Sequence, residues 1–377
     1  MMPFIDLQAQ FAAHETAIRA RMDAVLAHGK FILGPEVAEL EQRLAAYVGA
    51  NHCVTCASGT DALLLALMAE GVGPGDAVVT TAFTFIATAE VIALLGARPV
   101  FADIDPRTWN LSPQALDRCL SEWNQAWGRL RAVIAVDMFG LPADYPELSR
   151  IAARHGALLV EDAAQGFGGA VHGQAACSFG DYAATSFFPA KPLGCYGDGG
   201  AVFCPDPDKA ALLRSLRFHG KGADKYDNVR IGLNSRLDTL QAAVLLAKLD
   251  VFDAELAARQ RLAQVYLEEL DGLGDRIVPP HAPAGWRCAW AQFSLLLPSP
   301  DVRSRVQAAL QAAGTPTIIY YPTPLHRQGA FAGLGEVPGS LPVSEDVSRR
   351  ILSLPMHPYL SEDQARSVAA KLRAALA

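Results

Sequence analysis

A single lysine stands between two segments that would hold it in place. Lys191 follows an apolar, strand-like run over residues 182–188 and precedes the glycine-rich stretch Gly194-Cys-Tyr-Gly-Asp-Gly-Gly200. A lysine fixed by backbone on both sides becomes a nucleophile toward carbonyl compounds when burial or a neighbouring cation lowers its pKa. A solvated loop lysine is the usual alternative for such a segment, so the interpretation depends on a second group upstream.

That second group is a carboxylate at the end of an apolar run. Residues 157–160 indicate a buried parallel strand, and Glu161, Asp162 and then Gln165 follow it. In open α/β sheets, ligands bind beyond the carboxyl ends of the strands. Pyridoxal phosphate requires an anion beside its ring nitrogen, because the protonated ring is the electron sink of its chemistry. We therefore assign Asp162 to the ring nitrogen and Gln165 to the phenolic oxygen, and we interpret Glu161 as a solvated charge.

A phosphate group would need a site of its own. The small residues 58–60 form a turn between a strand-like run and an apolar helix. Such a turn offers unpaired N–H groups and the positive end of the helix dipole, although an ordinary N-cap has the same sequence. Ser186, shortly before Lys191, is a candidate hydroxyl donor to the same phosphate. Phe83 or Phe85 could cover the ring of the cofactor, and spacing does not decide between them.

Taken in order, these motifs resemble the DegT/DnrJ/EryC1/StrS sugar aminotransferases. The resemblance rests on Ala57-Ser-Gly-Thr-Asp61, Glu161-Asp-Ala-Ala-Gln165, Ser186-Phe-Phe-Pro-Ala-Lys191, Gly232-Leu-Asn-Ser-Arg-Leu-Asp-Thr-Leu-Gln241, Tyr321-Pro-Thr-Pro-Leu-His326 and Leu354-Pro-Met-His-Pro358. It covers nearly the whole chain. It implies an α/β protein of fold type I among pyridoxal phosphate enzymes, with a mostly parallel central sheet and a smaller C-terminal α+β domain.

The resemblance also implies roles by position. It makes Lys191 the Schiff-base lysine, Asp162 the partner of the ring nitrogen and Phe85 the aromatic stacked on the ring. The other cofactor contacts that it implies are Ser58, Gly59, Thr60, Gln165 and Ser186. Asn234 matches an asparagine that reaches the phosphate from the neighbouring subunit, which implies a homodimer with shared active sites. Lys191 argues against the family branch that has histidine here and removes a hydroxyl group instead.

Within the family, the chain is most similar to enzymes that aminate C3 of a UDP-linked 3-keto-2-acetamido-2-deoxy-glucuronic acid, with L-glutamate as donor, for envelope polysaccharides such as lipopolysaccharide. Arg236 would bind the uronate, because its fork of N–H donors fits a carboxylate. The other expected substrate contacts are Tyr320, Tyr321 and His326. Tyr320 departs from the histidine of that subgroup, so a neutral 3-keto or 4-keto deoxysugar nucleotide remains the alternative. A sugar dehydratase or a non-catalytic sensor also stays open.

The composition excludes several other classes. The chain has 377 residues, 51% of them hydrophobic, and a net charge of −7, which leaves no broad basic surface for nucleic acid. The basic residues between Arg214 and Arg236 form either a solvated face or a pocket for a nucleotide diphosphate. The longest apolar stretch, near residues 85–95, is too short for a membrane span, and we expect no secretory signal. Seven cysteines indicate no disulfide framework, and Cys53 and Cys56 are interpreted as buried thiols. We therefore expect a cytoplasmic protein.

Apolar runs alternate with helical patterns over residues 50–205, which predicts a mainly parallel sheet. The predicted strands lie at 77–80, 98–103, 132–136 and 158–160, and the predicted helices at 87–95, 145–155, after Leu237, at 252–270 and at 302–313. Residues 272–290 are predicted to form a connection, and 293–297 and 317–320 to join the smaller domain. The predicted domains are 1–250, with an N-terminal helix at about 5–27 near the small domain, and 251–377. A loop at 220–228 either closes over the site or lies on the surface.

Overall fold

The computed structural model describes residues 2–224, 226–333 and 340–377 and contains one central seven-stranded sheet. From edge to edge its strands are β1 (His52–Cys56), β9 (Gly200–Cys204), β8 (Tyr182–Ser186), β5 (Leu158–Asp162), β4 (Arg129–Val136), β2 (Asp76–Thr81) and β3 (Arg98–Ala102). The strands are parallel except β9, which is antiparallel to both of its neighbours. The prediction of a mostly parallel sheet is confirmed.

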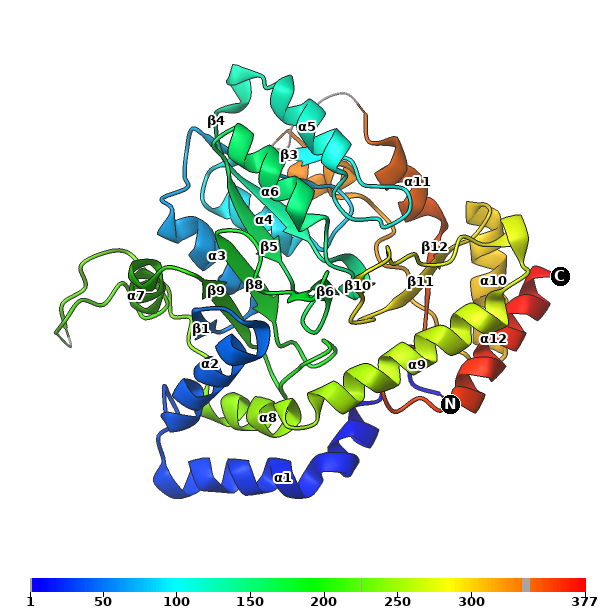
Figure 1. Ribbon diagram of the computed structural model, residues 1–377, viewed down its shortest axis with the longest axis horizontal. Coiled ribbons are helices and arrows are strands. Elements are labelled where there is room, and N and C mark those ends of the chain that lie inside the picture. Colours follow the sequence, from blue (N-terminus) through cyan, green and yellow to red (C-terminus); the bar gives the residue numbers. More distant parts are fainter. Residues whose placement is uncertain (1, 225, 334–339) are drawn as a thin grey trace.

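Helices cover both faces of this sheet (Figure 1). One face carries α3 (Gly59–Ala69), α4 (Ala87–Leu94) and α7 (Pro207–Leu216). The other carries α2 (Pro35–Val48), α5 (Pro113–Ser121), α6 (Tyr145–Arg154) and α8 (Thr239–Leu249). Because both faces are covered, the strands are continuous apolar runs rather than alternating ones, and every residue of β2 is buried.

The smaller domain is built around an antiparallel pair, β11 (Phe293–Leu296) and β12 (Ile351–Leu354). The long helix α9 (Phe252–Leu270) packs against it together with α12 (Glu362–Leu376), and α10 (Pro300–Ala312) and α11 (Pro342–Arg350) complete the domain. Tyr266 and Phe293 lie in its core with ring centroids 4.7 Å apart. Residues 317–320 do not form a strand with this pair. They make one bridge, between Ile318 and Ser353, and the chain then turns into the cavity described below.

The connection at 272–290 returns to the large domain. Within it, β10 (Trp286–Arg287) pairs with β6 (Ala170–Val171), which also pairs with β7 (Gln174–Ala175). Short 3-10 helices occur at Gln125–Trp127, Met138–Gly140, Gly274–Arg276, Leu325–Arg327 and Gly329–Phe331. The connection is therefore an ordered link between the two cores.

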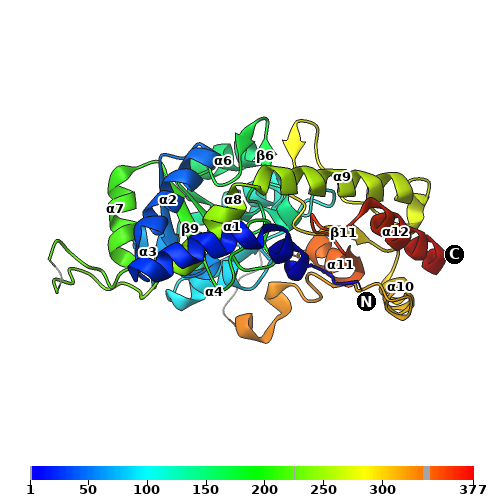
Figure 2. The same ribbon diagram turned by 90° about the horizontal axis from the view of Figure 1, so that it is seen from below.

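The N-terminal helix α1 (Leu7–His28) lies along α8 (Figure 2). Asp6 caps it by accepting a hydrogen bond from the Ala9 amide at 2.8 Å, and Ile18 packs on Val244 of α8. Its first turns also approach the C-terminal part of the chain, where the His14 ring lies 2.8 Å from the Tyr359 hydroxyl. This helix thus contacts both α8 and the C-terminal part of the chain.

All seven cysteines are buried and unpaired by disulfides, which confirms the interpretation of Cys53 and Cys56 as buried thiols. Among the helices of the described residues, none combines the length and the apolar character that crossing a bilayer requires. Lys225, inside the predicted loop at 220–228, lies outside the described residues.

Candidate active site

A cavity of about 430 Å³ opens at the carboxyl ends of β5 and β8, where it meets Tyr320 and Tyr321. It brings together most of the residues that the sequence singled out. These are Ser58, Gly59, Thr60, Phe85, Asp162, Gln165, Ser186, Lys191, Tyr320 and Tyr321. They come from segments more than 250 residues apart in the chain, so the fold collects them.

Lys191 enters the cavity from a tight turn. Its amide donates to the Phe188 carbonyl at 2.8 Å, and the Cys195 amide donates to the Phe187 carbonyl at 2.8 Å. Burial lowers the pKa of the Lys191 amine, and the negative charge of Asp162 opposes this shift. A lysine with a lowered pKa supplies more free amine, which is the form that attacks a carbonyl or accepts a proton.

Asp162 lies at the end of β5 and is 4% exposed. Burial raises the pKa of its carboxyl group, while hydrogen bonds from the Thr88 hydroxyl at 2.8 Å and the Ala164 amide at 3.2 Å, and the charge of Lys191, lower it. A buried carboxylate with neutral donors favours a cationic partner. A protonated ring nitrogen would be such a partner.

The interpretation of Glu161 as a solvated charge is wrong. Its side chain is fully buried and accepts hydrogen bonds from the Cys177 amide at 2.7 Å and the Phe179 amide at 2.9 Å. Successive residues of a strand point to opposite faces of the sheet, so Glu161 and Asp162 cannot share an environment. Burial and the neighbouring Asp137 raise the pKa of the Glu161 carboxyl group.

The segment at 58–60 serves both as an N-cap and as an open helix terminus. The Ser58 hydroxyl accepts from the Asp61 amide at 3.0 Å at the start of α3. A Cβ atom on Gly59 would lie 2.6 Å from Cβ of Ser186, so only glycine allows this approach. Ser58, Gly59, Thr60 and Ser186 therefore form one polar corner of the cavity, which suits a phosphate group.

The structure separates the two candidate aromatics. Phe83 is fully buried in the core, whereas Phe85 is 55% exposed and lines the cavity. Gln165 is held at both ends of its amide. Its carbonyl accepts from the Phe139 amide at 2.8 Å, and its NH₂ group donates to the Tyr321 hydroxyl at 3.2 Å. One rigid amide thus joins the strand end to the smaller domain.

Sequence reasoning missed several lining residues, namely Ile5, Thr84, Thr88, Phe188, Asp198 and Gln292. Thr84 and Thr88 lie 3.0 Å apart through their hydroxyls and connect to Asp162. Thr88 lies in the first turn of α4, and Thr84 precedes the helix, so helical spacing did not mark the pair. Asp198 belongs to the glycine-rich stretch that follows Lys191. Gln292 stands in an apolar context and offered no signal.

These residues fit pyridoxal phosphate, because one cavity holds a half-buried lysine, a buried carboxylate, an exposed aromatic face and a glycine-opened helix terminus. Residues 13–373 match the DegT/DnrJ/EryC1/StrS aminotransferase family. The chain belongs to this family. It is a sugar aminotransferase that depends on pyridoxal phosphate, as the enzymes of this family do.

Three relatives show how close the similarity is. A UDP-2-acetamido-2-deoxy-3-oxo-D-glucuronate aminotransferase from Pseudomonas aeruginosa is 46% identical over 99% of both chains. A UDP-N-acetyl-3-dehydro-alpha-D-glucosamine 3-aminotransferase from Acidithiobacillus ferrooxidans is 41% identical over 100% of this chain and 98% of its own. The crystal structure of a family member from Brucella abortus has 50% identity and a TM-score of 0.94, with 99% of both chains covered.

Three of the expected site residues of this aminotransferase do not line the cavity of their own chain. Asn234 is exposed and accepts a hydrogen bond from Arg236, whose guanidinium lies 5.2 Å from the Phe218 ring centroid. His326 binds Glu345 at 3.0 Å instead of facing the cavity. The sequence placed all three by motif position, which does not show the direction of a side chain.

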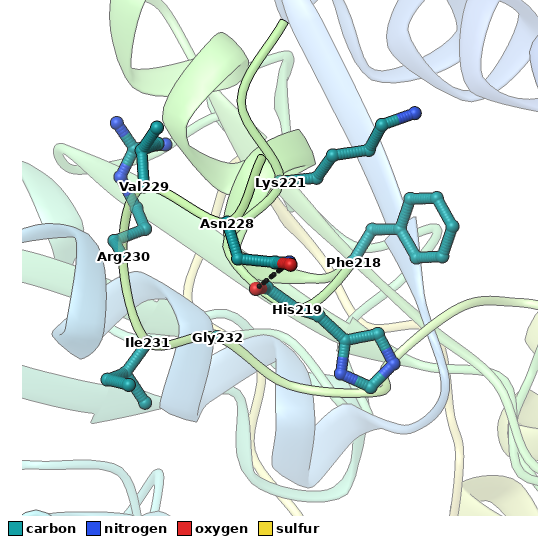
Figure 3. A pocket seen from close by; sticks show the side chains of 8 residues that line it. All are labelled: Phe218, His219, Lys221, Asn228, Val229, Arg230, Ile231 and Gly232. Atoms are coloured by element: carbon teal, nitrogen blue, oxygen red, sulfur yellow. Dashed lines mark hydrogen bonds between the residues drawn. The ribbon is translucent and has the colours of Figure 1, made fainter. Parts of the chain in front are cut away.

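Asn234 and Arg236 adjoin an arm, formed by residues 218–224 and 226–232, that projects from the body beside α7 (Figure 1). The arm is held by bridges between Phe218 and Asn234 and between Lys221 and Asn228. An open hollow of about 690 Å³ lies on it. Figure 3 shows the side chains that line this hollow, where the Asn228 side chain donates to the His219 carbonyl at 2.9 Å. The predicted loop at 220–228 thus forms part of a projecting arm.

Proposed function

We propose that this enzyme transfers the amino group of L-glutamate to C3 of a UDP-linked 3-keto-2-acetamido-2-deoxy-glucuronic acid, in the biosynthesis of an envelope polysaccharide such as lipopolysaccharide. The observation that carries the proposal is the full-length similarity, at 46% identity, to an aminotransferase named for this substrate. The cavity supports it through Lys191 and Asp162, since both line the same space and burial shifts the pKa of each.

Each side chain that lines the cavity has a separate role in the proposed reaction. When bound, pyridoxal phosphate supplies an electron sink for the negative charge that develops on the α-carbon of the amino donor. Lys191 Nζ would hold the cofactor and, as a free amine, would take the α-carbon proton of the donor. The Asp162 carboxylate would keep the ring nitrogen protonated, and Phe85 would cover the ring. The α3 terminus and Ser186 would hold the phosphate.

We further propose a homodimer in which each cavity is completed by the partner subunit. Asn234 and Arg236 face away from the cavity of their own chain but lie beside a projecting arm. Exposed apolar side chains on and near that side support an interface. They include Phe31 at 46%, Val229 at 54% and Ile231 at 88% exposure. In this dimer Arg236 would bind the carboxylate of the partner's substrate, as its fork of donors suits.

Two broader features belong to the same proposal. We place the large domain at residues 1–250 and the small domain at 251–377, because α9 begins in the core of the first and ends in the core of the second. We also place the enzyme in the cytoplasm, where nucleotide sugars are made.

A neutral 3-keto sugar nucleotide is the second candidate substrate. Tyr320 lines the cavity with a phenol, which has no cationic form and so provides no positive charge for a uronate; burial raises the pKa of that hydroxyl and keeps it neutral. The relative from Acidithiobacillus ferrooxidans, named for a UDP-linked 3-dehydroglucosamine, is 41% identical. The second candidate is therefore the same sugar without the carboxylate.

Absorbance spectroscopy tests both parts of the proposal. The purified protein with pyridoxal phosphate should show a visible band that L-glutamate converts to a near-ultraviolet one. The UDP-linked 3-keto uronate should then restore the visible band faster than the neutral 3-keto sugar. Restoration by the neutral sugar alone would replace the first substrate by the second. The absence of any visible band would overturn the role of Lys191.

A further inference from the structure

A second lysine lies directly beneath the turn that carries Lys191. Lys248 of α8 is 1% exposed, although lysine is almost never fully buried without a partner. Gln241 stands seven residues earlier in α8, and residues seven apart lie on one face of a helix. This face of α8 therefore presents two polar side chains to the underside of the lysine turn, which we define as residues 191–199.

Both side chains bind the backbone of the lysine turn. Lys248 Nζ donates to the Gly194 carbonyl and lies 5.2 Å from the Tyr196 ring centroid. The Gln241 carbonyl accepts from the Tyr196 amide at 2.8 Å, and its NH₂ group lies 3.4 Å from the Tyr196 carbonyl. Two residues of the turn, Gly194 and Tyr196, are thus anchored from below by one helix.

The turn transmits this anchoring to Lys191 because it is tightly packed. A Cβ atom on Gly194 would lie 2.6 Å from the carbonyl oxygens of Phe188 and Pro189. The Phe188 carbonyl accepts the hydrogen bond from the Lys191 amide at 2.8 Å. A shift of Gly194 would therefore move the two residues against which the Lys191 backbone is held.

We propose that Lys248 is a positioning residue of this aminotransferase, which holds the Gly194 carbonyl so that Lys191 stays aimed into the cavity. The consequence for catalysis rests on the role proposed above for Lys191, whereas the anchoring itself does not. Burial lowers the pKa of Lys248 to about 8, with Glu255 opposing this shift and Arg259 adding to it. A buried lysine that is costly to charge would be replaced by an apolar residue if it only filled space.

The test compares Lys248→Met with Lys209→Met in the full chain loaded with pyridoxal phosphate. Lys209 is a matched control, since its Nζ also lies over a tyrosine, 4.8 Å from the Tyr182 ring centroid, and pairs with Glu70 at 2.8 Å. It lies on α7, outside the lysine turn. Hydrogen exchange of residues 191–199 is measured together with cofactor affinity, kcat and KM.

Lys248→Met should raise the exchange rate of residues 191–199 about tenfold, the size expected for one lost buried hydrogen bond. It should also weaken cofactor binding and lower kcat more than it raises the donor KM. Lys209→Met should change none of these. Unchanged exchange and cofactor affinity in Lys248→Met, with only a lower melting temperature, would overturn the proposal. Faster exchange with unchanged kcat would retain the anchoring but refute the positioning role of Lys248, whereas the role of Lys191 itself is tested by the visible band described above.

Gln241→Leu keeps the proposal testable if Lys248→Met does not fold. It removes the two contacts to Tyr196 while Lys248 stays in place. The anchoring model expects faster exchange at Tyr196 and a lower kcat than in the unaltered enzyme. Exchange equal to that of the unaltered enzyme would show that α8 does not hold the turn.

Discussion

The cofactor cavity and a polar seam beside α9 both contain charged groups away from bulk solvent, but these groups differ in what they are paired with. We define the polar seam as Gln10, His14, Glu255, Arg259, His357 and Tyr359. In the seam, Glu255 accepts hydrogen bonds from the Tyr359 hydroxyl at 2.5 Å and from the side-chain NH₂ group of Gln10 at 3.2 Å. Arg259 donates to the Trp290 carbonyl at 2.9 Å. In the cavity, Lys191 and Asp162 line open space.

The difference shows how buried charge can serve two purposes. Burial makes any unpaired charge expensive, so the seam gives its charged groups, Glu255 and Arg259, partners within the protein and thereby ties α1 and α9 to the segment before α12. In the cavity, protein groups do not use all of the hydrogen-bonding and charge-pairing capacity of the lining side chains, and a bound ligand would use the remainder. Changes in the cavity should therefore affect catalysis more than folding, and changes in the seam should do the reverse.

The largest effect is expected for Lys191→Ala. It removes the amine that holds the cofactor and moves the proton, and a positioned acid–base group alone contributes about 10²–10⁴-fold of rate. Turnover with L-glutamate and the keto sugar nucleotide should fall at least that far, while the melting temperature of the cofactor-free protein stays close to that of the unaltered chain. A strong loss of stability would mean that Lys191 is a structural residue like those of the seam.

A somewhat smaller loss is expected for Asp162→Asn. The substitution keeps the shape and the Thr88 hydrogen bond but removes the negative charge beside the ring nitrogen. Turnover should fall about 10²–10³-fold, as for the loss of one electrostatic group at a transition state, while some cofactor is retained. Rates are compared under saturating cofactor, with Asp181→Asn as a control on the neighbouring strand. Unaltered turnover would rule out the assignment of Asp162.

Mixing two inactive variants would sharpen the comparison across subunits. Lys191→Ala and Asn234→Ala each remove one part of the proposed shared site. In a homodimer with shared sites, a mixed pair carries one cavity in which both residues are intact. Co-expression should therefore recover part of the activity that neither variant shows alone. Activity no higher than the sum of the separate variants would place Asn234 outside the partner's cavity.

The smallest effect concerns the pH dependence of stability at His357. Burial, together with Arg259, lowers the pKa of this histidine to about 4, and Asp6 opposes the shift. Between pH 6.5 and 4 the unfolded chain therefore binds a proton that the folded chain refuses, so stability falls as the pH drops. His357→Leu should lose roughly 1 kcal/mol less than the unaltered protein between pH 7 and 5.

Urea unfolding at the two pH values measures this difference, and His155→Gln on the surface of α6 serves as a control. An equal loss of stability in the His357→Leu variant would show that the histidine is already charged in the fold. The seam would then hold a charged histidine without a hydrogen-bond partner, and the comparison drawn above would fail.

Local pattern was sufficient for most elements of the fold. The continuous apolar runs predicted β2, β3, β4 and β5, and α9 has the predicted bounds of Phe252–Leu270. Such patterns are local because burial on both faces removes polar residues from a strand. Residues 317–320, which were predicted to join the smaller domain, contact it through one bridge, between Ile318 and Ser353.

The candidate site was predicted unevenly for a similar reason. Motifs of only a few residues were enough to identify Lys191, Asp162 and the turn at 58–60. Glu161 was misread, because its partners at Cys177 and Phe179 arrive from a segment that folds back beneath β5. His326 was misplaced, because Glu345 draws it away from the cavity.

The sequence by itself determined the class of chemistry, since a lysine, a strand-end acid and a small-residue helix start define it by type and spacing. The tertiary structure decided which side chains face the cavity. It separated Phe85 from Phe83, turned Glu161 into the core and set Lys248 under Gly194, 54 residues away in the chain. The types and order of residues are visible in short stretches of the sequence, whereas the burial and direction of a side chain depend on packing between distant segments.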